Sequence, residues 1–148
     1  MGFEIFSDEY FMNEALKEAK IAFDRDEVPI GAIVVCNKTI VAKAHNLTET
    51  LTDVTAHAEM QAITAASNYL GAKFLDECTL YVTLEPCMMC AGALYWSRIG
   101  RVVFAAKDEK KGYSIFDPPL LHPKTKVIQG ILQKQAAQLM RDFFRRKR

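Results

Sequence analysis

The sequence predicts an α/β protein, a three-layer α/β/α sandwich around a mixed central sheet of about five strands. Segments with helical periodicity alternate along the chain with short β-rich runs, and this order is typical of a sheet covered by helices on both faces. The chain has 148 residues, of which half are apolar and a quarter are charged. That length and composition suit one domain with a sizeable core, so we expect residues 1–148 to form a single domain.

The first predicted element is an amphipathic helix over residues 7–24. Ser7 can cap its N-terminus, and the two acids that follow suit the positive end of the helix dipole. Its apolar stripe consists of Phe11, Ala15, Ala19 and Ala22. Two short β-rich runs follow at 32–36 and 39–44, and the two residues between them predict a hairpin.

Two further helices are predicted in the middle of the chain. Residues 56–66 have a helical pattern, with Thr55 as a candidate N-cap. Residues 79–84 alternate between apolar and polar side chains, which predicts a strand. Pro86 follows this strand and suits the first position of the next helix, because its missing N–H would have no partner there.

The last third of the chain begins with an apolar run at 101–106, which predicts another strand. Residues 107–125 contain glycine and several prolines, and predict a long loop of the kind that often carries function. Residues 127–129 can add a last short strand. The final helix is predicted over 131–146, and its apolar face consists of Leu132, Ala136, Leu139, Met140 and Phe143.

Two short stretches carry the chemistry, and each lies at the predicted start of a helix. Residues 57–59 read His-Ala-Glu, and residues 86–90 read Pro-Cys-Met-Met-Cys. His57, Cys87 and Cys90 can hold one Zn²⁺ ion and leave a coordination position open for water. Glu59 is then free to carry protons beside the ion. We therefore predict a catalytic zinc site.

Other readings of the cysteine pair are a redox-active dithiol and a closed structural zinc site. The first leaves the His-x-Glu pattern unexplained, and the second needs a fourth ligand, whereas the sequence has no second Cys-x-x-Cys. The two remaining cysteines, Cys36 and Cys78, lie in or beside apolar runs. We expect both to be buried free thiols, which favours a reducing compartment, the cytoplasm.

The sequence also bears on location and on charge. No apolar run approaches the length of a membrane span, and the acidic N-terminus does not fit a secretory signal, so no membrane association is expected. Residues 124–148 contain eight basic residues and one acid, although the whole chain carries only +1. The rings and cations of residues 143–148 suit stacking on bases and pairing with phosphates. A solvated helix end, whose cations complement the helix dipole, is the alternative.

Longer strings are more specific than the metal pattern, which cytidine, guanine and adenosine deaminases share. They read DEVPIGA at 26–32, TAHAEM at 55–60, LYVTLEPC at 80–87, CAGA at 90–93 and SRIGRVVF at 97–104. On these strings, with DxKxG at 108–112 and the terminal Phe-Phe pair, the chain closely resembles the bacterial tRNA adenosine deaminase family over nearly its whole length.

The resemblance implies a cytidine deaminase-like fold, a homodimer and a tRNA anticodon stem-loop as substrate. The implied reaction is hydrolytic conversion of the wobble adenosine to inosine. It also implies that His57, Cys87 and Cys90 bind zinc and that Glu59 shuttles protons. The implied contacts to the flipped base are Asn46, Ile30, Ala58 and the chain around Leu84 and Glu85, and those to neighbouring nucleotides are Asp108 and Phe144.

Alternatives remain open at this point. Asn46 can instead make a local turn bond. Deamination of a free base or nucleoside, guanine or cytosine/cytidine, is the alternative activity, and it makes no use of the basic tail. A non-catalytic nucleic-acid-binding module would need neither Glu59 nor an open zinc position.

Overall fold

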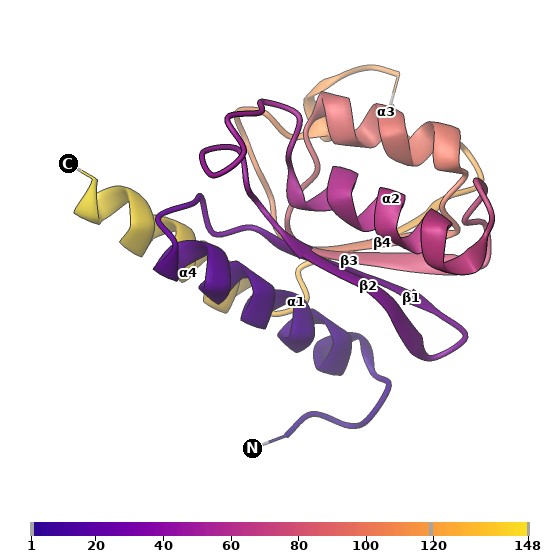
Figure 1. The fold of residues 1–148 in the computed structure, drawn as a ribbon, viewed down its shortest axis with the longest axis horizontal. Helices are drawn as coiled ribbons and strands as arrows, with labels where there is room; N and C mark the ends of the chain where they lie inside the picture. The colour runs from indigo at the N-terminus through magenta and orange to yellow at the C-terminus, as the bar shows by residue number, and fades with distance from the viewer. Residues whose placement is uncertain (1, 119, 148) are drawn as a thin grey trace.

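The structure is a computed structural model that describes residues 2–118 and 120–147. Within these residues, five strands form one mixed sheet in the order β2-β1-β3-β4-β5, with α2 and α3 on one face and α1 and α4 on the other (Figure 1). The predicted three-layer α/β/α sandwich is confirmed. The strands are β1 (Gly31–Cys36), β2 (Thr39–His45), β3 (Cys78–Leu84), β4 (Arg101–Ala106) and β5 (Lys126–Gln129). The helices are α1 (Asp8–Asp24), α2 (Ala58–Leu70), α3 (Met88–Ser97) and α4 (Gln133–Arg146), with a 3₁₀ turn, η1 (Tyr113–Ile115).

Strand direction brings several chain segments to one edge of the sheet. β1 is antiparallel to both β2 and β3, whereas β3, β4 and β5 are parallel to one another. The start of β1 therefore lies beside the ends of β2, β3 and β4, and Gly31 pairs with His45 while Leu84 pairs with Ala106. The loops that leave this edge are where a ligand site is expected in an open α/β sheet.

Alternation along the strands divides the core between the two faces of the sheet. Leu80 and Val82 of β3 pack with α2 and α3, whereas Tyr81 packs with α1 and α4. The predicted stripe of α1 is buried, from Phe11 to Ala22. A Cβ atom at Gly31 would overlap the carbonyl group of Ala15. Glycine at this position therefore lets α1 pack closely on β1.

The hairpin follows the sequence prediction, whereas the prediction of two buried thiols holds for Cys78 but not for Cys36. Asn37 and Lys38 both have positive φ, as a two-residue type I′ hairpin turn requires, and they join β1 to β2. Cys36 and Cys78 lie opposite each other across β1 and β3 as free thiols, of which Cys78 is buried and Cys36 is half-buried. In the part of the chain that the structure describes, no helix is long and apolar enough to cross a membrane.

The predicted starts of the two site helices are wrong by two residues. The N-cap of α2 is His57, because the hydroxyl and N–H of Thr55 are bonded to Asp53 in the preceding turn. Pro86 lies outside α3, whose N-cap is Cys87, and its carbonyl accepts a hydrogen bond from the N–H of Tyr113. A strand end and a loop contact, rather than helix propensity, thus fix where α3 begins.

Candidate functional site

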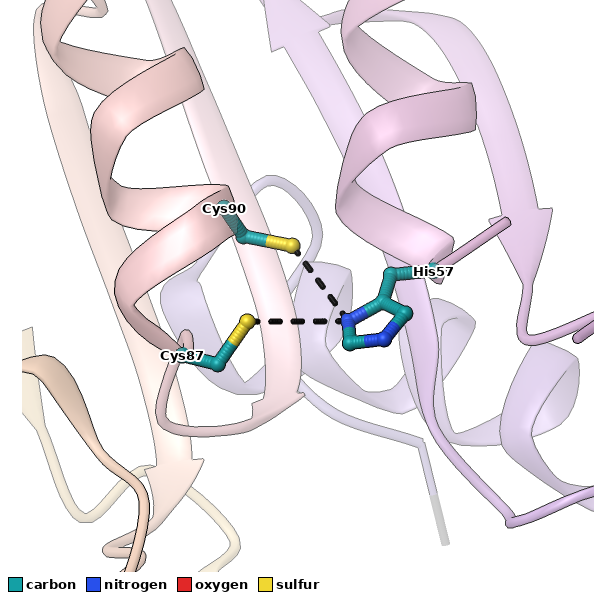
Figure 2. A group of neighbouring side chains, drawn as sticks. All are labelled: His57, Cys87 and Cys90. Carbon is teal, nitrogen blue, oxygen red and sulfur yellow. Dashed lines mark hydrogen bonds between the residues drawn. The ribbon is translucent and has the colours of Figure 1, made fainter. Parts of the chain in front are cut away.

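Three candidate metal ligands meet between the starts of α2 and α3, as Figure 2 shows. His57 Nδ1 lies 3.6 Å from the Sγ atom of Cys87 and 3.6 Å from that of Cys90. A tetrahedral zinc ion holds nitrogen at about 2.0–2.1 Å and sulfur at about 2.3 Å, which separates the two ligand atoms by about 3.6 Å. The three side chains therefore have the spacing that such an ion needs.

The backbone at the two helix starts explains why these side chains converge. His57 and Cys87 are both N-cap residues in extended conformation, and neither makes a side-chain capping bond to the described residues. The imidazole and the thiol are therefore free to turn toward each other. Cys90 lies in the first turn of α3, fully buried, and faces the same point.

The electrostatics of this cluster favour deprotonation of one thiol. Hydrogen bonds with Cys90 and His57 lower the pKa of Cys87 to about 4. The same bond to Cys87 raises the pKa of His57, and the Cys87 sulfur together with burial raises the pKa of Cys90. A metal ion bound here would replace the protons that the cluster retains, so its binding would release protons.

Glu59 is the fourth chemical group of the site. It lies in the first turn of α2, two residues after His57, and only 4 % of its surface is exposed. Burial raises its pKa to about 7. A carboxyl group with a pKa in this range can both take and give a proton at neutral pH.

A cavity of about 290 Å³ opens above Glu59. This volume is at the lower end of the range for small-molecule sites, which suits a ligand about as large as one base. Three of the four chemical groups, those of His57, Glu59 and Cys87, line it, whereas Cys90 is fully buried and is not a lining residue. The cavity is also lined by every residue that the sequence analysis names as a substrate contact: Ile30, Asn46, Ala58, Leu84, Glu85, Asp108 and Phe144.

Four further lining residues were not among the predicted contacts: Val28, Thr48, Lys111 and Met140. The sequence predicts Met140 on the core face of the last helix, and its four-residue spacing from Phe144 places both side chains on the same side of α4. That spacing could have indicated a second contact. Thr48 and Lys111 lie in loops, where periodicity carries no such signal.

Glu85 contacts the cavity, but its carboxylate is engaged elsewhere. Oε1 accepts a hydrogen bond from the N–H of Asp108 at 3.0 Å, and Oε2 accepts one from the N–H of Ser114 at 3.0 Å. A Cβ atom at Gly112 would overlap this carboxylate. Glu85 thus ties the loop after β4 to the end of β3, and a direct contact with substrate stays a prediction.

The basic tail divides into two sets of side chains. Phe143 is buried, and Arg146 lies over the ring of Phe23 and donates to the carbonyl of that residue at 2.7 Å. Arg146 and Lys147 are both paired with Asp26, at 3.3 and 2.6 Å. Phe144, by contrast, is 46 % exposed and lines the cavity. Part of the tail that the sequence analysis assigns to nucleic acid therefore holds α4 against the end of α1.

Comparison with known families agrees with this architecture. The MafB19-like deaminase family model matches residues 6–148, which is nearly the whole chain. The fold and the site together therefore define a deaminase domain.

Individual relatives narrow this class. The chain is 48 % identical to a tRNA-specific adenosine deaminase of Aquifex aeolicus, over 95 % of each chain. It is 46 % identical to that of Bacillus subtilis, over 95 % of this chain and 91 % of the relative. A solved structure from a study of A-to-I editing by tRNA:A34 deaminases has a TM-score of 0.82 and 42 % identity, and the match covers 88 % of this chain and 98 % of that one. The chain belongs to the tRNA-specific adenosine deaminase family.

Proposed function

We propose that this chain is a zinc-dependent enzyme that hydrolyses adenosine to inosine at the wobble position of a tRNA anticodon and releases ammonia. The observation that carries the proposal is one cavity lined by two members of the metal cluster, His57 and Cys87, and by the buried carboxyl group of Glu59. The similarity to curated tRNA-specific adenosine deaminases supports the choice of substrate.

In this proposal, His57, Cys87 and Cys90 would hold the zinc ion as a neutral imidazole and two thiolates. The ion would lower the pKa of a water molecule and so supply a nucleophile near neutral pH. Glu59 takes a proton from the attacking water as the new C–O bond forms at C6 of adenine, and delivers that proton to N1. A second proton, again carried by Glu59, goes to the exocyclic nitrogen, which leaves as ammonia.

The cavity walls supply position rather than chemistry. Asn46 can hydrogen-bond the base, and Ile30, Ala58 and Leu84 can pack against its faces and exclude bulk water. Asp108 and the exposed ring of Phe144 line the same cavity, and in this proposal they contact the nucleotides on either side. An anticodon loop is a suitable substrate, since an unpaired base can be splayed out at low cost.

We also propose that the enzyme is a homodimer and works in the cytoplasm. The outer face of α3 exposes Met88, Tyr95 and Trp96, and Trp96 is 77 % exposed. Large apolar side chains grouped in this way are typical of a subunit interface. The free state of all four cysteines is consistent with a reducing compartment.

Ammonia release tests the proposed substrate. The zinc-loaded enzyme is incubated in parallel with an anticodon stem-loop carrying adenosine at the wobble position and with free adenosine, cytidine and guanine. We expect turnover of the stem-loop and inosine at the wobble position, with the free compounds turned over at least about a hundredfold more slowly. Faster turnover of guanine or cytidine would establish the alternative activity instead.

A further inference from the structure

Besides Glu59 and Glu85, a third buried carboxylate lies next to the cavity lining and has no role in the chemistry described so far. Glu27 follows α1, and none of its surface is exposed. Both of its oxygens accept hydrogen bonds. Oε1 accepts from the N–H of Glu49 at 3.1 Å and from Asn46 Nδ2 at 3.4 Å, and Oε2 accepts from the N–H and the hydroxyl of Thr50, each at 2.6 Å.

All of these donors belong to one loop, residues 46–50, which leaves the end of β2 and leads toward the metal cluster. Two backbone N–H groups of this loop are satisfied by the Glu27 carboxylate in place of a secondary-structure partner. Burial alone raises the pKa of Glu27, but the hydrogen bonds from Thr50 and Glu49 outweigh it and lower the pKa overall. The side chain therefore holds the loop as an ionised acceptor.

The contact with Asn46 also sets which end of its amide points to the ligand. An ionised carboxylate can only accept hydrogen bonds, so the NH₂ group of Asn46, and not its carbonyl, must face Glu27. The second hydrogen of this NH₂ group is directed to Thr48 Oγ1 at 3.2 Å. The amide carbonyl is then the end of Asn46 that is left for a ligand in the cavity that Asn46 lines.

We propose that Glu27 is a positioning residue of the deaminase: it holds residues 46–50 in place and fixes the amide of Asn46 with its carbonyl toward the substrate. This inference rests on the proposed function, because it assigns Asn46 to the base. Glu27 touches neither the base nor the metal ligands in this account, and acts only through the loop.

A double-mutant cycle separates positioning from general stability. Glu27→Gln keeps the size of the side chain, but its NH₂ group opposes the N–H of Glu49 or Thr50, and it can face either end of Asn46. Glu27→Gln and Asn46→Ala are made singly and together, and kcat/KM for the anticodon stem-loop is measured under single-turnover conditions. We expect Glu27→Gln to lower kcat/KM about tenfold in the native background and less than about twofold in the Asn46→Ala background.

The control variant is Asp8→Asn, which removes a carboxylate from an ion pair with Arg101 that is remote from the cavity lining. Asp8→Asn should lower the melting temperature and leave kcat/KM unchanged in both the native and the Asn46→Ala background. This result would show that a loss of stability alone does not produce the coupling expected between Glu27 and Asn46. Zinc content is measured for every variant and should remain one ion per chain.

The inference is overturned if Glu27→Gln has no effect on kcat/KM, or if it lowers kcat/KM by the same factor in both backgrounds. If the native enzyme does not turn over the stem-loop at all, the proposed function fails, and that result is distinct from either of these. Should Glu27→Gln not fold, Thr50→Val replaces it. That variant removes the hydroxyl donor to the same carboxylate, and its smaller loss of about threefold should likewise disappear in the Asn46→Ala background.

Discussion

His57 and Cys87 occupy N-cap positions that most helices give to Ser, Thr, Asp or Asn. The absence of a capping side chain costs each helix about 1 kcal/mol. The free energy of zinc binding, about 10 kcal/mol or more in small structural sites, is large enough to offset that cost. At the scale of the residue, two helices that are poorly capped by their own side chains are therefore consistent with a site that a metal ion completes.

Asp8 gives a residue-scale prediction about pH. It accepts two hydrogen bonds from Arg101, at 2.7 and 3.1 Å, and one from the hydroxyl of Tyr81 at 2.8 Å. The bond from Arg101 lowers the pKa of Asp8 below its ordinary value of 3.8. The Asp8 carboxylate therefore contributes its full stabilisation of the folded protein above pH 3.8. This contribution is lost as the pH falls through the lower pKa that Asp8 has in the folded state.

We expect Asp8→Asn to reduce the free energy of unfolding by about 1 kcal/mol at pH 7. Urea denaturation of both proteins at pH 7 and at pH 3 measures the difference. The gap should narrow at the lower pH, and an equal gap at both values would contradict the assigned ion pair.

At the residue scale, the sequence predicted those functional side chains that belong to a short local motif. The His-x-Glu and Cys-x-x-Cys patterns predict groups that the structure brings together. Glu27 and Glu85 could not be understood in this way, because their partners are backbone N–H groups more than 20 residues away along the chain. The identity of a residue as glutamate does not indicate which distant loop its carboxylate will bind.

At the scale of the element, helix and strand positions followed periodicity, whereas helix starts followed tertiary contacts. The buried stripe of α1 was predicted from spacing alone. The starts of α2 and α3 were misplaced because a local bond of Thr55 and a loop contact of Pro86 compete with capping. Tertiary contacts also changed the expected role of the last helix. Its composition suggested basic side chains free to pair with phosphates, but Arg146 and Lys147 are paired with Asp26.

Gly112 tests how Glu85 holds the loop after β4. We expect Gly112→Ala to lower the melting temperature and to reduce kcat/KM for the stem-loop, because its Cβ would displace the carboxylate that binds Asp108 and Ser114. Gly2→Ala near the exposed N-terminus is the control, since a Cβ there meets nothing within 4 Å. It should leave stability unchanged. Similar melting temperatures for the two variants would refute the packing argument.

Variants of two neighbouring arginines, Arg145 and Arg146, should distinguish the side of α4 that packs on the protein from the side that faces solvent. Arg146→Ala removes the contacts with Phe23 and Asp26, so we expect a loss of about 1 kcal/mol in the free energy of unfolding. Arg145 has a side chain that is 72 % exposed, and Arg145→Ala should leave stability unchanged. If Arg145 meets a phosphate, its variant binds the stem-loop more weakly and with a reduced salt dependence. Equal stability of both variants would contradict the docking of α4.

At the scale of the whole molecule, the site exists because one edge of the sheet gathers the start of β1 and the ends of β2, β3 and β4. The alternation of helices and strands predicts the layers but not this strand order. Ile30, Asn46 and Asp108 are far apart in the sequence, and residue spacing alone does not bring them to one cavity. The family resemblance named them, and the topology provides the physical reason.

The exposed face of α3 leads to a prediction about assembly. We expect the chain to be a dimer at micromolar concentration and Trp96→Glu to shift it toward the monomer, because a charge would replace the most exposed aromatic ring of that face. Size-exclusion chromatography with light scattering measures the mass. A wild-type monomer, or a variant that stays fully dimeric, would rule out this surface as the interface.

One metal ion held by three side chains, beside a carboxyl group that carries protons, is central to the proposed function. The direct test measures zinc per chain and ammonia release from the stem-loop for the native protein, Glu59→Gln and Cys90→Ala. We predict one zinc ion per chain in the native protein and in Glu59→Gln, turnover at least about a hundredfold lower in Glu59→Gln, and neither bound zinc nor turnover in Cys90→Ala. A native protein that is active without zinc, or a Glu59→Gln variant that retains full activity, would contradict the account.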